Sequence, residues 1–139
     1  MAPGVKTMWN DPDTPPERQA PLALAYVGDA VFELYIRTLL LKKNSRVDRL
    51  HKEAVGLVKA QAQAGYYKKL EEHLTGEERE ILHRGRNAKS RHPKSAAVQE
   101  YHMSTGFECL LGYLFLKNDE DRLVQLLELA LREEEENHG

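Results

Sequence analysis

Residues Leu22–Arg37 read LALAYVGDAVFELYIR, a segment that is apolar on nearly every side of a helix. Asp29 lies in its middle, directly after Gly28, where an uncompensated buried carboxylate would cost several kcal/mol. We therefore expect Asp29 to be paired, hydrogen-bonded, protonated or bound to a metal ion. Glycine is unfavourable inside a helix, so Gly28 indicates the close approach of another element. A capped or water-bridged structural aspartate is the alternative.

A second apolar segment repeats this pattern. Residues 95–117 read SAAVQEYHMSTGFECLLGYLFLK, and Glu108 lies inside the apolar part of this sequence. Gly106 and Gly112 flank Glu108 and would let another helix approach closely. Two helices of this kind, each with one carboxylate close to a glycine, predict a shared site for Asp29 and Glu108.

Two carboxylates that lie close together repel each other unless a cation or a proton lies between them. Mg²⁺ suits such oxygen ligands, because it needs only one or two carboxylates and keeps several waters. A bound Mg²⁺ lowers the pKa of a coordinated water and polarises a phosphate. Asp29 and Glu108 thus support the hypothesis of metal-dependent phosphodiester hydrolysis. Cys109 has no evident partner base, so we interpret it as a small core residue.

The rest of the chain predicts more helices and no strands, so the expected fold is all-α. The segment 21–43 is expected to form the first helix. A second helical region covers about 47–74, with Gln61 on its apolar face and Gly65 as a candidate break.

Two capping signals define the later helices. The sequence Thr75-Gly76-Glu77-Glu78 is a capping box, and it predicts a helix that ends near Gly85. Asn118 is expected to cap a last amphipathic helix whose leucines face the core.

A basic segment follows the capping-box helix. Residues 84–94 read RGRNAKSRHPK, with five basic side chains and no acid. Its glycine, asparagine, serine and proline are loop formers. Arginine and lysine at this density suit phosphate oxygens, so the segment predicts an anion-binding loop. The alternative is a solvated loop without a ligand.

The bulk composition fits one soluble globular domain. The chain has 139 residues, of which 41% are hydrophobic and 30% are charged. Residues 119–139 carry eight acids and two arginines, which leaves a charge of +4 on residues 1–118. This mildly basic body permits a polyanionic partner. The single cysteine fits a reducing cytoplasm, and the sequence predicts neither a signal peptide nor a membrane-spanning segment.

The two apolar segments resemble motifs of a known family. LALAYVGDAVFELYIR resembles the ribonuclease III signature, ERLEFLGDAVL in its usual form, with residues 28–31 retained. STGFECLLGYLFL is similar to the second acidic motif of that family, DxFEALIGAIYLD, with Phe107, Glu108 and Gly112 retained. Together with RGRNAKS, and with no recognisable double-stranded-RNA-binding domain after them, these motifs resemble Mini-III, the short bacterial ribonuclease III.

The resemblance implies an all-α catalytic domain over about residues 20–133, which forms a homodimer with a valley for double-stranded RNA. An irregular arm over residues 1–19 and an acidic tail over residues 134–139 flank this domain. The implied activity is Mg²⁺-dependent cleavage, with Mn²⁺ as a substitute, that leaves 5′-phosphate and 3′-hydroxyl ends. The implied substrate is the terminal stem of the 23S ribosomal RNA precursor, with a large-subunit ribosomal protein as a candidate partner.

The resemblance also assigns site residues. Asp29 and Glu108 would bind the metal and carry catalysis. The candidate RNA-binding residues of the basic segment are Arg84, Arg86, Asn87, Lys89, Ser90 and Lys94.

Two positions depart from the family pattern. The usual signature has an acid four residues before its aspartate, where this chain has Ala25, and the second motif has an aspartate where this chain has Thr105. The two remaining carboxylates favour one metal ion per site, with Ser104, Thr105 or ordered waters as the candidates that complete its shell. Glu33 is interpreted as structural or dimer-related. The rival functions are a catalytically silent RNA-binding or ribosome-assembly factor on this scaffold, and a helical protein-interaction module.

Overall fold

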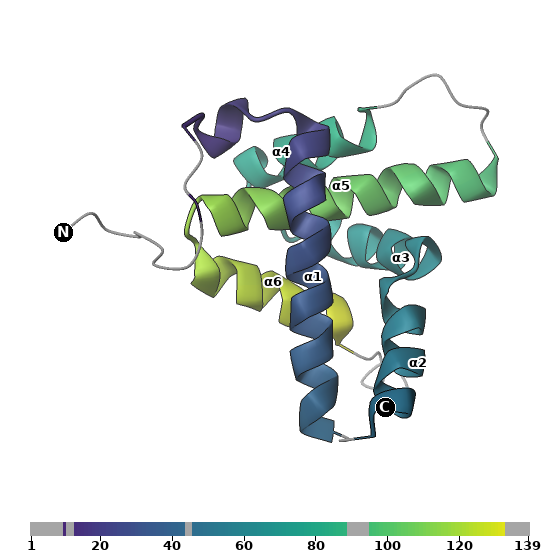
Figure 1. The fold of residues 1–139 in the computed structure, drawn as a ribbon. Coiled ribbons are helices and arrows are strands. Elements are labelled where there is room, and N and C mark those ends of the chain that lie inside the picture. The colour runs from purple at the N-terminus through teal and green to yellow at the C-terminus, as the bar shows by residue number, and fades with distance from the viewer. Residues whose placement is uncertain (1–9, 11–12, 44–45, 89–94, 133–139) are drawn as a thin grey trace.

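The structure is a computed structural model that describes residues 10, 13–43, 46–88 and 95–132. Within these residues the chain forms one short 3-10 helix, six α-helices and no strand, which confirms the all-α prediction (Figure 1). The elements in chain order are η1 (Pro16–Arg18), α1 (Pro21–Lys43), α2 (Val47–Val58), α3 (Ala60–Glu71), α4 (Gly76–Arg86), α5 (Ala96–Leu116) and α6 (Glu120–Leu131).

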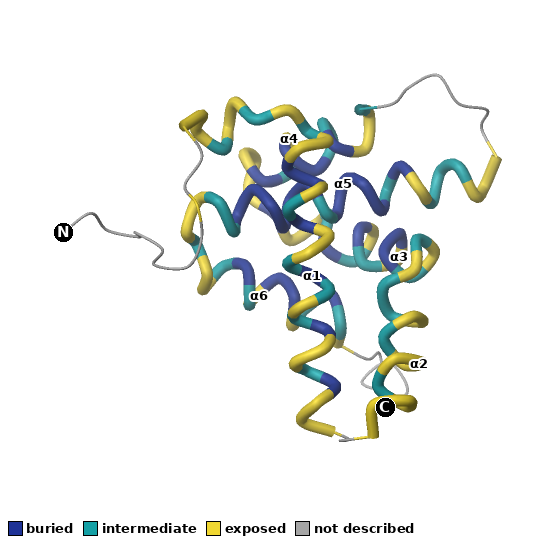
Figure 2. Tube along the Cα trace, viewed as in Figure 1, coloured by how far each residue is buried: buried dark blue, intermediate teal, exposed yellow. Residues whose placement is uncertain are grey.

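The helix α5 forms the centre of the molecule. The helices α1, α3, α4 and α6 all pack against it, and α1 crosses it steeply (Figure 1). Every residue from Ser104 to Leu114 is buried except Glu108, which is half-buried (Figure 2). A helix that is apolar all round is expected to lie inside a core, and α5 does so.

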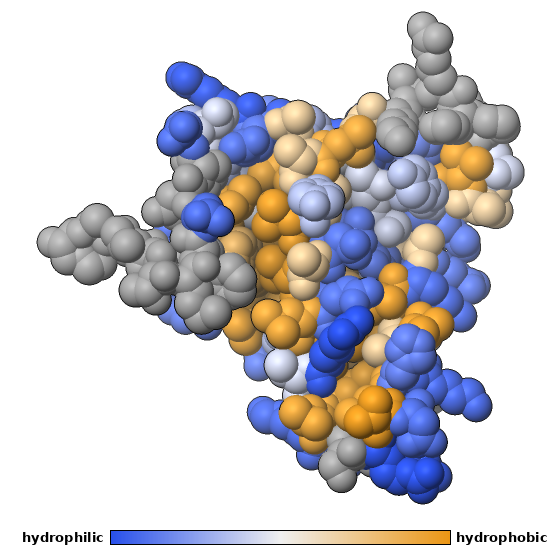
Figure 3. Space-filling view, in the orientation of Figure 1, coloured by the Kyte–Doolittle hydropathy of each residue, from blue (hydrophilic) through white to orange (hydrophobic). Residues whose placement is uncertain are grey.

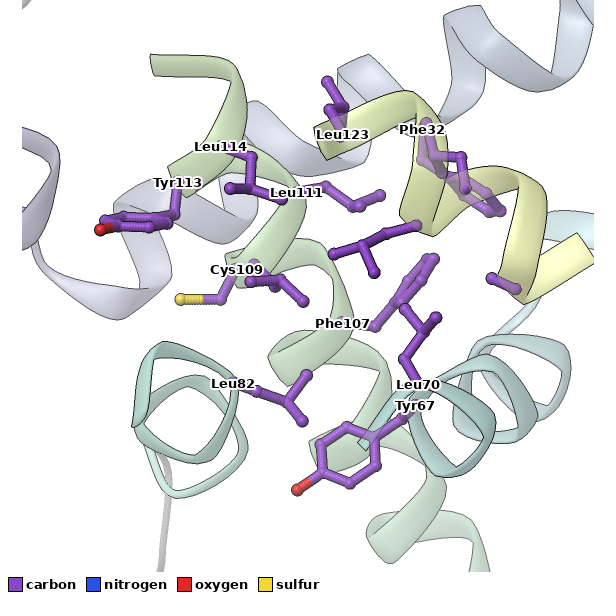
Figure 4. Close-up of a cluster of buried hydrophobic side chains, with 14 of the residues drawn as sticks. Phe32, Tyr67, Leu70, Leu82, Phe107, Cys109, Leu111, Tyr113, Leu114 and Leu123 are labelled. Atoms are coloured by element: carbon purple, nitrogen blue, oxygen red, sulfur yellow. The ribbon is translucent and has the colours of Figure 1, made fainter. Parts of the chain in front are cut away.

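The core joins α1, α3, α4, α5 and α6 through large apolar side chains (Figure 4). The ring of Phe107 on α5 meets the ring of Phe32 on α1 edge to face, with centroids 5.1 Å apart. Tyr66 on α3 lies edge to face on Phe32, with centroids 5.7 Å apart. Such pairs contribute about 0.5–1.5 kcal/mol beyond the area that they bury, and they fix α1 and α3 on the same part of α5.

The prediction that α1 is apolar and buried on nearly every side is wrong for one face. The side chain of Tyr26 is 83% exposed and that of Leu34 is 56% exposed. Figure 3 shows an apolar band on this face of the molecule, over α1 and its neighbours. Leu24, Phe32 and Ile36 on the opposite face are fully buried. Apolarity alone could not distinguish a core face from a face left for a partner.

The second helical region divides at Lys59 and not at Gly65. Lys59 has extended backbone angles between α2 and α3, whereas Gly65 lies inside α3. Two contacts across the corner stabilise the break: the Tyr66 hydroxyl donates to the Leu57 carbonyl (3.0 Å), and Gln63 Nε2 donates to the Val58 carbonyl (2.8 Å). These contacts span five and nine residues of the chain, and glycine propensity, which suggested Gly65, does not report on them.

The capping box at the start of α4 is confirmed. The Thr75 hydroxyl accepts from the Glu78 amide, and the Glu78 carboxylate accepts from the Thr75 amide. Glu78 also forms two hydrogen bonds of 2.9 Å with the Arg122 guanidinium, which hold its pKa below the usual value and join α4 to α6.

The cap of α6 differs from the prediction. The Asp119 side chain accepts from the Arg122 amide, and Asn118 before it has φ 63°, in the left-handed region. Asparagine tolerates that conformation better than most residues. Asn118 therefore ends the α5 turn, and Asp119 caps α6.

Further predictions concern the core, the membrane and the chain ends. Cys109 is fully buried, and burial raises its pKa to about 12, as expected for a core thiol. Within the described part of the chain, no helix is both long and apolar enough to cross a bilayer. Most of the arm over residues 1–19 and all of the tail over residues 134–139 lie outside the described residues.

Candidate active site

The crossing of α1 and α5 brings Asp29 and Glu108 together. At this crossing the backbones come unusually close, because Gly28 lies against the backbone of Glu108 and Gly112 lies against the backbone of Leu24. Asp29 follows Gly28 on α1, and its carboxyl group hydrogen-bonds that of Glu108. The structure therefore brings together the two carboxylates that the sequence predicts to share a site. Asp29 is exposed, contrary to the expectation of a buried acid, and Glu108 is half-buried.

The environment of Glu108 favours its neutral form. Burial, the negative charge of Asp29 and the hydrogen bond between the two groups raise the pKa of Glu108 to about 8. The charge of Glu33 acts in the same direction. Glu108 therefore holds its proton more tightly than an ordinary glutamate does, and a proton or a cation between the two groups relieves their repulsion.

Gln63 on α3 contributes a third polar group, which the sequence analysis missed. Its side chain is 1% exposed, and it hydrogen-bonds Glu108 in the sense that lowers the pKa of that carboxyl. The sequence pattern predicts that Gln61 lies on the apolar face of one long helix. The break at Lys59 changes the helical phase, so that Gln63 is buried and Gln61 is exposed.

The donor set fits one Mg²⁺ ion. Among the described residues, no group of three or more His, Cys, Asp or Glu side chains could hold a metal ion. Mg²⁺ needs only one or two carboxylates when waters and substrate phosphates complete its shell. Asp29 is open to solvent on one side of the pair, which leaves room for such ligands. The repulsion that protonates Glu108 is the same interaction that a divalent cation would relieve.

Comparisons with known proteins identify the family of this chain. Residues 22–119 match the family model of the Ribonuclease III domain. This chain belongs to the ribonuclease III family. Mini-ribonuclease 3 of Thermoanaerobacter sp. is 50% identical over 119 residues, which cover 84% of each chain. Mini-ribonuclease 3 of Clostridium tetani is 43% identical over 129 residues, which cover 86% of this chain and 85% of that relative.

A solved structure is also similar. The crystal structure of a Fusobacterium nucleatum protein matches with a TM-score of 0.77 and 30% sequence identity, over 91% of this chain and 99% of that one. The predicted resemblance to Mini-III is thereby confirmed, and membership in the ribonuclease III family supports an RNA endonuclease.

The two positions that depart from the ribonuclease III pattern, Ala25 and Thr105, are both buried. Ala25 is buried, 7% exposed, among the core residues of α1. The Thr105 hydroxyl donates to the Tyr101 carbonyl within α5 (3.0 Å), and the Ser104 hydroxyl donates to Gln63 Oε1 (2.9 Å). Both hydroxyl groups thus have partners other than the carboxylates. Ser104 is connected to the site through Gln63.

Glu33 lies near the pair but has a partner of its own. Its Oε1 accepts from Arg37 Nη2 at 2.9 Å, one turn along α1, and both side chains are exposed. Its charge still raises the pKa of Glu108. Glu33 is therefore a surface ion-pair residue whose charge also acts on Glu108.

The described RNA-binding candidates lie at the end of α4, which extends through Arg86. The Arg84 guanidinium donates to the Glu17 carbonyl (3.3 Å), and the Arg86 side chain is exposed, near the Tyr67 hydroxyl. Asn87 is exposed and ends the helix. These hydrogen bonds do not join the segment to Asp29 or Glu108. The other candidates lie outside the described residues: Lys89, Ser90 and Lys94.

Proposed function

We propose that this protein is a Mg²⁺-dependent endoribonuclease that cleaves double-stranded RNA as a homodimer in the cytoplasm. The observation that carries this proposal is the pairing of Asp29 with Glu108 at the α1–α5 crossing of a ribonuclease III domain. The catalytic domain would cover residues 20–133. The proposed substrate is the terminal stem of the 23S ribosomal RNA precursor, which the resemblance to Mini-III implies, with a large-subunit ribosomal protein as a possible assistant.

Asp29 and Glu108 would hold the ion. When bound, Mg²⁺ would supply an activated water and polarise the scissile phosphate, and Mn²⁺ could replace it. Glu108 has to lose its proton before it can act as a ligand, because its pKa lies near 8. Asp29, on the exposed side of the pair, would orient the ion towards the RNA backbone. Cleavage would leave a 5′-phosphate and a 3′-hydroxyl.

The exposed face of α1 supports the homodimer. It lines a groove of about 1020 Å³ between α1, the end of α5 and α6, whose walls include Tyr26, Leu34, Phe115 and Val124. Large exposed apolar patches of this kind usually mark interaction sites (Figure 3). A second copy that presents the same face would cover both patches at once. Asp29 also lines the groove, so the two active sites would lie next to the interface.

The basic segment after α4 supports binding of the RNA backbone. Arg86 and Asn87 are exposed where α4 ends. Lys89, Ser90 and Lys94 continue the same segment in the sequence. Arginine and lysine bind phosphate oxygens without reading bases, which suits a nuclease that recognises a duplex by its shape.

A catalytically silent RNA-binding or assembly factor is the second candidate. It is favoured by Ala25 and Thr105, which remove two of the four carboxylates usual for the family. The retained Asp29–Glu108 pair opposes it, because a protein that only binds RNA gains nothing from carboxylates directed at phosphates.

A cleavage assay distinguishes these candidates. The purified protein is incubated with a labelled RNA stem that joins the two ends of the 23S precursor. The nuclease is expected to make discrete cuts on both strands with Mg²⁺ and none with EDTA. Binding to the stem without any cut, at several Mg²⁺ and Mn²⁺ concentrations, would favour the silent factor. No salt-sensitive RNA binding at all would favour a protein-interaction module.

A further inference from the structure

The side chain of Gln63 is a buried polar group that the roles of Asp29 and Glu108 do not explain. It lies on α3, it is 1% exposed, and the core residues Tyr67 and Leu70 follow it on the same side of the helix. A buried amide costs stability unless its donors and acceptor are all satisfied. The partners of this amide therefore show what the structure uses it for.

The hydrogen bonds of Gln63 fix the orientation of its amide. Nε2 donates to the Val58 carbonyl at 2.8 Å, and a carbonyl can only accept. Oε1 accordingly faces the other way, where it accepts from the Ser104 hydroxyl at 2.9 Å. These two partners come from the α2–α3 corner and from α5. The amide is thus held at both ends by elements that are themselves packed in the core.

Ser104 and Glu108 are one turn apart on the same face of α5, so the amide that contacts Ser104 also faces Glu108. Gln63 lies within reach of the Glu108 carboxyl. Ser104 precedes Glu108 by one turn of α5, so the chain Ser104–Gln63–Glu108 leaves α5 and returns to it through α3. This arrangement places a fixed amide beside the carboxyl group of Glu108.

We propose that Gln63, anchored by Ser104 and the Val58 carbonyl, is a positioning residue that directs the Glu108 carboxylate towards Asp29 and thereby sets the affinity for the divalent cation. This inference rests on the proposed function, because it assumes that Asp29 and Glu108 bind the cation. Groups that orient metal ligands typically change metal affinity by about 10–100-fold when they are removed.

The test measures Mn²⁺ binding to the free protein by titration calorimetry, without RNA. Gln63→Leu keeps the approximate volume and removes the amide, and it is expected to weaken Mn²⁺ binding about 10–100-fold. Ser104→Ala removes the anchor alone and is expected to have a smaller effect in the same direction. Gln61→Leu is the matched control, because it is the same change at an exposed position of α3, and it should leave Mn²⁺ binding unchanged.

A double variant separates positioning from general damage. If Ser104 acts through Gln63, Ser104→Ala should weaken Mn²⁺ binding in the wild-type background and add nothing in the Gln63→Leu background. RNA cleavage should follow the same pattern. The variants should need a higher Mg²⁺ concentration for half-maximal rate, and their cleavage rate should recover at high Mg²⁺. Circular dichroism and thermal unfolding establish whether each variant is folded. If Gln63→Leu does not fold, the Mn²⁺ affinity of Ser104→Ala tests the proposal.

The proposal would be overturned if folded Gln63→Leu bound Mn²⁺ with wild-type affinity, or if Ser104→Ala did so in the case that Gln63→Leu does not fold. Fully additive effects of the two substitutions on Mn²⁺ affinity would also overturn it. These results leave the proposed function intact. Failure of the proposed function would give a different result: Asp29→Asn would bind Mn²⁺ with the same affinity as the wild-type protein.

Discussion

Gly28 on α1 lies directly against the backbone carbonyl of Glu108 on α5. The reciprocal contact is made by Gly112 on α5, which lies against the Leu24 carbonyl on α1. These contacts let two helix backbones approach without intervening side chains. Because Asp29 and Glu108 lie beside these contacts, the same close packing that stabilises the fold also sets the separation of the two carboxylates.

Gly28→Ala should therefore damage both the fold and the site. A Cβ at this position would overlap the Glu108 carbonyl and lie 2.9 Å from the Gly112 amide nitrogen. Overpacking of this kind costs about 1–3 kcal/mol, which urea denaturation would measure as a lower midpoint. Gly65→Ala is the control, since a Cβ there meets nothing within 4 Å inside α3 and should stabilise the protein by up to about 1 kcal/mol. Equal stability of the two variants would contradict the close contact.

The stability of the metal-free protein should depend on the titration of Glu108. The pKa of Glu108 is about 8 in the folded protein, whereas a glutamate in the unfolded chain has the ordinary value of 4.5. The folded state therefore favours the protonated form. The stability that this proton provides is present below pH 4.5 and is lost as the pH rises towards 8. Glu108→Gln cannot lose a proton, and we expect it to raise the melting temperature at pH 8 in EDTA by roughly 5 °C, with little gain at pH 4.5.

The exposed residue Glu53 on α2 provides the comparison for Glu108. Glu53→Gln should leave the melting temperature nearly unchanged at both pH values. Mg²⁺ should raise the melting temperature of the wild-type protein at pH 8 and not that of Glu108→Gln. A Glu108→Gln protein that melts like the wild type across this pH range would show that the repulsion is absent.

Tyr26→Glu should disrupt the proposed homodimer. Tyr26 is 83% exposed and lines the groove between α1 and α6, so a carboxylate there would be buried without a partner in the dimer. Sedimentation equilibrium should show a dimer for the wild type and a monomer for the variant. Val55→Glu places the same charge on an exposed apolar residue of α2 and should remain dimeric. A wild-type protein that sediments as a monomer at micromolar concentration would refute this interface.

The basic segment should determine how RNA binding depends on salt. Each phosphate contact that is lost reduces the slope of log affinity against log salt by about one. Arg86→Gln and Lys89→Gln together should lower that slope by roughly two for duplex RNA, in titrations by fluorescence anisotropy. Arg132→Gln, at the end of α6, should leave the slope unchanged. An unaltered slope in the double variant would mean that the duplex binds elsewhere.

Local sequence signals predicted much of this structure. The capping box of Thr75 and Glu78 involves neighbouring residues only, so its pattern was sufficient to locate the start of α4. The paired acids were also predictable, because a carboxylate next to glycine in an apolar helix demands a partner. In the structure, the carboxyl groups of Asp29 and Glu108 are each other's partners, as expected.

Other features depend on contacts between distant residues, and the sequence did not indicate them. The break at Lys59 is stabilised by Gln63 and Tyr66, and neither carries a local signal for a corner. Because that break resets the helical phase, the burial of Gln63 was not predictable either. Tyr26 is exposed although its segment is apolar, since periodicity cannot tell a core face from an interface.

The central claim is that Asp29 and Glu108 form one divalent-metal site for RNA cleavage. Single-turnover cleavage of the labelled precursor stem in Mg²⁺, by Asp29→Asn, Glu108→Gln and the double variant, tests it most directly. Two ligands of one ion act as a unit, so each folded single variant should fall to near background, and the double variant should be no slower than either. Normal cleavage by either folded single variant would contradict the claim.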